Sequence, residues 1–241
     1  MIRLIVAAGV AALLLTPPAA EAQAPAPAGA GQTPAAGQAP SAAAQPPAAG
    51  GDRIHVDGFR DAKWGMSEAE VKNVIVNQFK IPADKLKTET NVTEKTGVLT
   101  IAVPDLIERA GIAHVSYIFG YTTKKLIQIN LVWGTPADPQ AKPEMVVAAA
   151  NELRQLFTEE GYDPATIVTN ARAPDGGIIV FQGQDADKHT TVLRLVSAQA
   201  PADKDAKSEG KDKPQAATAL FLSYVMDTAN PDIFKLKKGQ F

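Results

Sequence analysis

The sequence contains no cysteine. This absence excludes disulfide bonds, thiolate metal sites, a cysteine nucleophile and a lipid-modified N-terminal cysteine. Aromatic residues make up only 6% of the chain, so a hydrophobic core must be built mainly from Val, Ile, Leu and Ala. Neither sign of charge dominates, because 24 Lys and Arg stand against 26 Asp and Glu and the net charge is −2. The composition therefore does not favour nucleic-acid binding, which needs a basic patch.

Motifs that carry chemistry are missing as well. The chain has no H-E-x-x-H, G-x-S-x-G, Walker or G-x-G-x-x-G sequence. Its histidines, His55, His114 and His189, lie far apart in the sequence, although a zinc site built from all three is an alternative to three unrelated positions. Asp185-x-Asp187 resembles a fragment of a calcium loop but lacks the closing Glu, which indicates a solvated turn. We predict no catalytic residue, no metal site and no cofactor.

Residues 1–22 have the pattern of a cleaved secretory signal peptide. Arg3 precedes an apolar run at 5–15, and a small-x-small sequence predicts the cut after Ala22. The alternative is a retained membrane anchor, but the apolar run is shorter than the roughly 20 residues that cross a bilayer. We therefore expect an exported protein, and the style of the signal indicates a bacterial periplasm. No transmembrane segment is predicted in the mature chain.

The composition divides the rest of the chain into a linker and a domain. Residues 23–51 are almost wholly Ala, Pro, Gly and Gln and carry no charge, which predicts a disordered linker. This linker is either a tether or a tolerated low-complexity tail. Mixed charged and apolar sequence begins at Asp52, so a single folded domain is predicted over 52–241. Within it, residues 199–217 are rich in Ala, Lys, Asp and Pro and predict a disordered loop.

The clearest structural signal is the stretch 64–79, WGMSEAEVKNVIVNQF. Ser67 followed three residues later by Glu70 forms a capping box, which starts a helix predicted over 68–79. Pro82 ends it. The apolar face of this helix holds Val71, Val74, Ile75 and Phe79.

A second helix is predicted from Pro143, which suits a first helical turn, to just before Gly161, which suits a helix end. Its apolar face holds Val146, Ala149, Ala150, Leu153, Leu156 and Phe157. Strands are predicted at 59–64, 97–103, 112–121, 126–133, 177–182, 190–198 and 218–226, and residues 83–96 predict a loop or a short edge strand. In the strand at 126–133, alternation predicts that Ile127, Ile129, Leu131 and Trp133 share one face. The fold class is therefore α+β, with two main helices packed on one face of an antiparallel sheet.

The two halves of the domain resemble each other. Trp64-Gly65 precedes the first helix and Trp133-Gly134 precedes the second, and about three strands follow each helix. This similarity predicts a tandem βαβββ-like pseudo-repeat that shares one sheet, with chance as the alternative explanation.

The run from Trp64 to Lys72 reads W-G-M-S-E-A-E-V-K. It resembles the W-G-[MT]-S-x-x-E-V-K helix opening of uncharacterised exported bacterial envelope proteins, and the G-M-[ST]-x-x-x-V opening of BamE-type outer-membrane assembly lipoproteins. The resemblance implies a small α+β fold, as in tandem-repeat β-lactamase-inhibitor-like proteins. This chain departs from the BamE type because it lacks the lipidated cysteine and has a long linker and a second helix-plus-sheet unit.

These observations predict a non-enzymatic protein–protein interaction module of the cell envelope, acting as an adaptor, assembly factor or inhibitor. The alternatives are a small-ligand or cell-wall-glycan binding domain, and a hydrolase in which His, Asp and Glu side chains meet in one cleft. An apolar patch on the sheet favours the first hypothesis. The candidate contacts with another envelope protein are Trp64, Trp133 and a basic tail of Lys235, Lys237 and Lys238, which alternatively contacts an anionic membrane surface.

Overall fold

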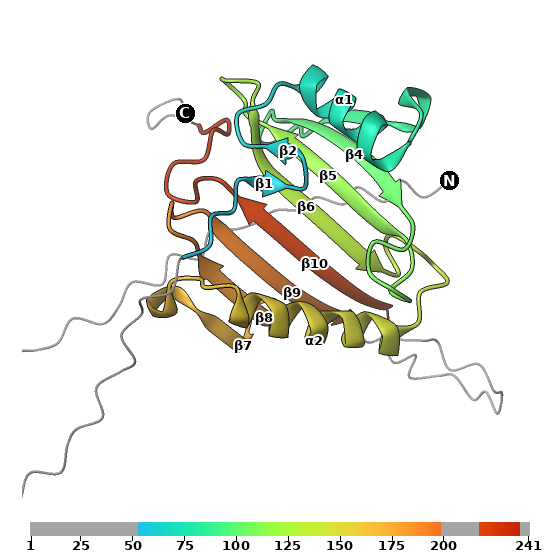
Figure 1. Ribbon diagram of the computed structural model, residues 1–241, viewed down its shortest axis with the longest axis vertical. Helices are drawn as coiled ribbons and strands as arrows, with labels where there is room; N and C mark the ends of the chain where they lie inside the picture. Colours follow the sequence, from blue (N-terminus) through green and yellow to red (C-terminus); the bar gives the residue numbers. More distant parts are fainter. Residues whose placement is uncertain (1–52, 199–216, 237–241) are drawn as a thin grey trace, which may run out of the picture. The chain divides into compact units, whose positions relative to one another are not determined.

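The computed structural model describes residues 53–198 and 217–236. The predicted signal peptide, the linker, nearly all of the predicted loop at 199–217, and Lys237 and Lys238 lie outside the described residues. Two α-helices pack on one face of an eight-stranded antiparallel sheet, so the predicted α+β class is confirmed (Figure 1). Within the described ranges, no helix combines the length and the apolar character needed to cross a membrane.

From each α-helix onward the two halves have the same order of elements, and the β1–β2 hairpin precedes only the first helix. The first half holds β1 (Gly58–Phe59), β2 (Ala62–Lys63), α1 (Glu68–Phe79), a 3₁₀ turn η1 (Ala83–Lys85), β3 (Lys87–Thr90), β4 (Gly97–Val103), β5 (Ala113–Phe119) and β6 (Leu126–Gly134). The second half holds α2 (Pro143–Glu159), η2 (Pro164–Thr166), β7 (Val168–Arg172), β8 (Ile178–Gln184), β9 (Thr190–Ala198) and β10 (Ala217–Val225). Four strands, not three, therefore follow each helix.

The strand order is β3-β4-β5-β6-β10-β9-β8-β7. Each half is an antiparallel meander, and the last strands of the two halves, β6 and β10, pair at the centre with Leu131 opposite Leu222. Both halves thus share one sheet, as the sequence similarity predicted. Helix α1 covers the first half and α2 contacts β8, β9 and β10 of the second half (Figure 1).

Helix α1 spans the predicted residues 68–79, and the predicted capping box is present at its start. The Ser67 hydroxyl accepts from the Glu70 backbone N–H at 3.4 Å, and the Glu70 carboxylate accepts from the Ser67 backbone N–H at 2.7 Å. Val71 and Ile75 are fully buried against the sheet. Lys80 adopts a left-handed conformation with φ 55°, which ends the helix.

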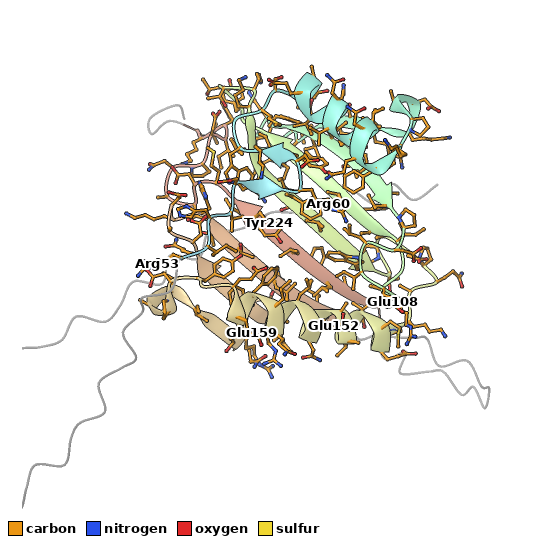
Figure 2. The ribbon with its side chains drawn as sticks, viewed as in Figure 1. Arg53, Arg60, Glu108, Glu152, Glu159 and Tyr224 are labelled. Atoms are coloured by element: carbon orange, nitrogen blue, oxygen red, sulfur yellow. The ribbon has the colours of Figure 1, made fainter. Side chains whose placement is uncertain are left out.

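We expect Ser67→Ala to lower the free energy of unfolding by about 1 kcal/mol, because the first turn loses its side-chain acceptor. The midpoint of thermal unfolding then falls by about 2–4 °C for a domain of this size. Glu152→Ala is the matched control, since Glu152 lies on the solvent side of α2 (Figure 2). Equal midpoints for the two variants would contradict a stabilising capping box.

Three predictions about local structure are wrong in detail. The segment 59–64 is not one strand but part of the β1–β2 hairpin, which turns at Arg60 with φ 54°. In β6, a bulge pairs Phe119 with Leu126, so Leu126 takes the core position and Ile127 lies out of register. In α2, Leu156 is 48% exposed and is not part of the apolar face.

The hairpin and α2 meet over the sheet through aromatic side chains. Tyr224 lies on the helix-covered side of β10 (Figure 2). Its ring centroid is 6.2 Å from that of Phe59 in β1 and 6.4 Å from that of Phe157 in α2. These contacts continue the core across the space between the two helices.

Candidate functional site

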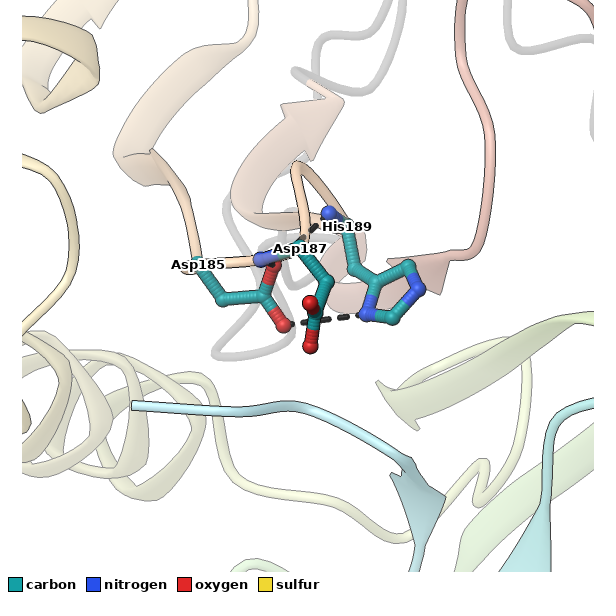
Figure 3. A group of neighbouring side chains, drawn as sticks. All are labelled: Asp185, Asp187 and His189. Atoms are coloured by element: carbon teal, nitrogen blue, oxygen red, sulfur yellow. Dashed lines mark hydrogen bonds and ion pairs between the residues drawn. The ribbon is translucent and has the colours of Figure 1, made fainter. Parts of the chain in front are cut away.

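One group of ionisable side chains has the spacing of metal ligands. Asp185, Asp187 and His189 lie in the turn between β8 and β9, and their potential ligand atoms are all within 4.8 Å of one another (Figure 3). It is the only such group in residues 53–198 and 217–236. The turn between β8 and β9 brings the three side chains together although each is two residues from the next in the sequence.

The carboxylate of Asp185 is engaged by hydrogen bonds on both oxygens. Oδ1 accepts from the backbone N–H groups of Asp187 and His189, at 2.9 and 2.8 Å. Oδ2 accepts from the backbone N–H of Val56 at 2.7 Å and lies 3.0 Å from Nδ1 of His189. The Asp185 side chain is fully buried. Asp185 therefore closes the turn and also attaches the N-terminal segment to it.

Further polar contacts attach the N-terminal segment nearby. Nδ1 of His55 lies 2.7 Å from the Asp187 carboxylate, and Nη1 of Arg53 lies 3.1 Å from that of Asp163. The hydrogen bond with Asp187 raises the pKa of His55, and the same bond lowers the pKa of Asp187. Both partners are exposed, so solvent screens this ion pair. We call the set His55, Val56, Asp185, Asp187 and His189 the N-terminal junction.

The hydrogen bonds of the N-terminal junction hold the N-terminal segment against the β8–β9 turn, and this structural role requires no ligand. An aspartate bonded to histidine Nδ1 resembles the orienting half of a catalytic triad. In the described part of the chain, however, no hydroxyl group bonds His189; its ring lies 5.9 Å from that of Trp64. Metal binding by Asp185 would compete with its hydrogen bonds to backbone amides. The predicted turn is present, but the prediction that it is solvated is wrong for Asp185.

The three histidines do not form a common site. His55 and His189 belong to the N-terminal junction, whereas His114 lies on β5 in the first half of the sheet. Burial lowers the pKa of His114, and the nearby charge of Lys87 lowers it further. The structure therefore offers no support for the three-histidine zinc alternative.

The second candidate is the face of the sheet that neither helix covers. In β5, Ala113, Val115, Tyr117 and Phe119 are buried on the helix side, while His114, Ser116 and Ile118 are half-buried on the other side. We call this other side the open face. On the four central strands, β5, β6, β10 and β9, its larger apolar members are Ile118, Val132, Phe221, Val225, Val192 and Val196.

Phe221 lies near the middle of the open face. The strand register places Val132 of β6 on one side of it and Arg194 of β9 on the other. The ring is half-buried by its neighbours. Arg194 forms an ion pair with Asp175 in the turn before β8, so its charge is compensated within the domain.

The open face carries little charge on its central strands. Among the side chains that β5, β6, β10 and β9 direct to it, only His114 and Arg194 are ionisable, and none is acidic. Charged residues make up 21% of the whole chain. The centre of the open face thus carries one charged side chain, Arg194, whose charge is balanced by Asp175.

The residues that the sequence predicts as contacts with a partner protein lie in different parts of the structure. Trp133 is 1% exposed and belongs to the core under the helices, so its ring cannot reach a partner in the folded domain. Trp64 is half-buried, and its Nε1 donates to the carbonyl of Val56 at 2.6 Å. Lys235 is exposed, while Lys237 and Lys238 lie outside the described residues.

Phe221 is absent from the sequence predictions. Its strand, ATALFLSYV, is apolar at positions that face both sides of the sheet, so alternation does not reveal which side is covered. Comparison with known proteins offers no guide either: this chain matches no family model, no curated protein and no solved structure.

Proposed function

We propose that this protein is a non-enzymatic binding module of the bacterial periplasm, and that its open face docks a folded protein of the cell envelope. In this role the module is an adaptor, an assembly factor or an inhibitor of its partner. The observation that carries the proposal is the neutral, partly apolar centre of the open face around Phe221.

The composition of the open face supports this function. Cores of protein–protein interfaces are depleted in charged residues and enriched in aromatic ones. Phe221 supplies an aromatic anchor, and Val132, Val192 and Val196 lie on the two adjacent strands. Small polar side chains such as Ser116 and Ser223 can hydrogen-bond a partner without placing a charge in the interface.

The rigidity of the open face also supports it. Strand β10 is paired along its length with β6 and β9, so the backbone under Phe221 is held on both sides. A surface that is already ordered loses little conformational entropy when it binds. The same side chains on a loop would have to be ordered at the moment of binding.

The test is the variant Phe221→Lys, with Leu156→Lys as the matched control. Leu156 is an exposed apolar residue on α2, so its replacement makes the same chemical change away from the open face. The long Lys stem lies along the apolar surface in both variants, which preserves the fold. Tagged protein is cross-linked in envelope extract, the bound proteins are quantified by mass spectrometry, and the leading partner is titrated after purification.

We expect one partner to bind the original protein and the Leu156→Lys variant with equal affinity, and to bind Phe221→Lys at least about 30-fold more weakly, as for a hot-spot residue. Circular dichroism confirms that both variants remain folded. A partner that binds all three proteins equally, or no reproducible partner, would overturn the assignment to the open face.

A further inference from the structure

A second surface forms at one end of the sheet, where the C-terminal tail packs against two turns. Asp232 of the tail accepts from the backbone N–H groups of Thr122 and Thr123 at 2.9 and 2.8 Å, in the turn between β5 and β6. The backbone N–H of Phe234 donates to the carbonyl of Glu94 at 2.9 Å, in the turn between β3 and β4. Figure 1 shows the red tail and the β5–β6 turn at the same end of the sheet.

Aromatic contacts hold these three segments together. The Phe234 ring lies 5.5 Å from that of Tyr121 in an edge-on arrangement. The ammonium group of Lys95 lies 3.8 Å from the centre of the Phe234 ring, within the range of a cation–π contact. We call the surface formed by residues 91–96, 120–125 and 231–236 the lysine end.

Each segment of the lysine end exposes one large apolar side chain. Val92 in the first turn is 86% exposed, Tyr121 in the second turn is 37% exposed, and Leu236 in the tail is 62% exposed. Val92 and Leu236 are the two most exposed large apolar residues among those the structure describes. These three side chains lie on segments that contact one another, so they form a candidate surface for binding.

The same three segments also carry lysines, and the ammonium group of Lys124 lies 5.3 Å from the centre of the Tyr121 ring. Lys95, Lys124, Lys125 and Lys235 are all exposed, and Lys95 and Lys124 line one cavity of about 460 Å³, together with the Glu68 side chain.

The carboxylates of the lysine end, Glu94 and Asp232, are engaged within the domain. Glu94 is half-buried, and burial raises its pKa. Burial alone would also raise the pKa of Asp232, but hydrogen bonds from Thr123 and Thr122 outweigh it and lower the pKa to about 2. Within these three segments, four exposed lysines therefore outnumber two carboxylates, and Glu68 at their border is paired with Lys72 at 2.6 Å. Lys237 and Lys238 follow in the sequence.

We infer that the lysine end docks on an anionic lipid bilayer. Exposed apolar side chains enter the boundary between headgroups and acyl chains, while the lysines beside them contact lipid phosphates. The same residue types fit a protein interface poorly, because interface cores are depleted in lysine. This surface is separate from the open face, so a membrane contact leaves Phe221 available to a protein partner.

The test is co-sedimentation of the chain from Gln23 to Phe241 with lipid vesicles. This chain keeps every described element and omits residues 1–22, whose apolar run would bind lipid by itself. One set of vesicles is phosphatidylcholine alone, and the other is an equimolar mixture of phosphatidylcholine and phosphatidylglycerol. We expect binding to the anionic vesicles only, and we expect high salt to release the protein.

The decisive variants are Lys124→Glu with Lys235→Glu, against Lys85→Glu with Lys142→Glu. Both pairs change the net charge equally, but Lys85 precedes β3 and Lys142 follows β6, at the opposite ends of those strands. Each lysine near an anionic membrane surface strengthens vesicle binding about fivefold. Replacing Lys124 and Lys235 together should therefore weaken binding at least ~25-fold. The control pair should stay within about twofold of the original protein.

A third variant, Val92→Ser with Leu236→Ser, tests the apolar tips and should also weaken binding. Lys95 is left unchanged throughout, because its contact with Phe234 holds the tail in place. Equal binding to neutral and anionic vesicles, binding to neither, or equal losses in the two lysine pairs would each overturn the proposal.

Discussion

Gly134→Ala is expected to lower the free energy of unfolding by about 3 kcal/mol or more. Gly134 ends β6 with φ 91°, a conformation that costs a residue with a side chain about 1–2 kcal/mol. The added Cβ would also overlap the carbonyl oxygen of Thr218 in β10, which accepts from the backbone N–H of Thr135 at 3.0 Å. The substitution therefore forces apart β6 and β10, the strands that join the two halves.

The matched control is Gly65→Ala, at the corresponding Trp-Gly pair before α1. Gly65 also has a positive φ, of 78°, but nothing lies within 4 Å of an added Cβ. Only the backbone cost of about 1–2 kcal/mol applies there. Urea denaturation of both variants measures the difference, and similar losses would show that the β6–β10 contact does not set the cost at Gly134.

Asp185→Ala is expected to cost about 3–4 kcal/mol, because it leaves one buried and two partly buried N–H groups without their acceptor. The backbone amides of Val56, Asp187 and His189 all lose their partner. For a domain of this size the thermal midpoint falls by roughly 6–16 °C. Amide hydrogen exchange at Val56 accelerates as well, because the N-terminal segment detaches from the turn.

The control for this prediction is Asp187→Ala in the same turn. Asp187 is exposed and its carboxylate contacts the exposed His55, so solvent replaces the lost contact. We expect no measurable change in the thermal midpoint for this variant. If Asp187→Ala destabilises the domain as much as Asp185→Ala does, the four bonds of Asp185 are not the source of stability at the junction.

Both helices were predicted with their correct ends because their signals are local. The capping box of Ser67 and Glu70 acts within the first turn of α1, and the predicted stop at Pro82 lies two residues after the left-handed Lys80 that ends the helix. Pro143 begins α2, and Gly161, with φ 86°, follows it. Periodicity then identifies the buried faces, apart from Leu156, which lies at the margin of the α2 stripe.

Strand β7 was not predicted because nothing local marks it. Its sequence, Val168–Arg172, is polar, and it is a strand only because it pairs with the edge of β8. The bulge at Leu126 was missed for the same reason, since it depends on how β5 and β6 align across the sheet. Pairing between strands is a property of two segments, so one segment cannot specify it alone.

The sequence by itself determined the fold class, the two helices and most of the strands, because capping, periodicity and turn chemistry act over a few residues. Only the tertiary structure decided which surfaces remain available. It buried Trp133, left Phe221 on the open face, and brought Val56 to Asp185 across 129 residues. Those outcomes depend on which side of the sheet the helices cover and on which distant segments meet, and burial of apolar surface across the whole domain settles both.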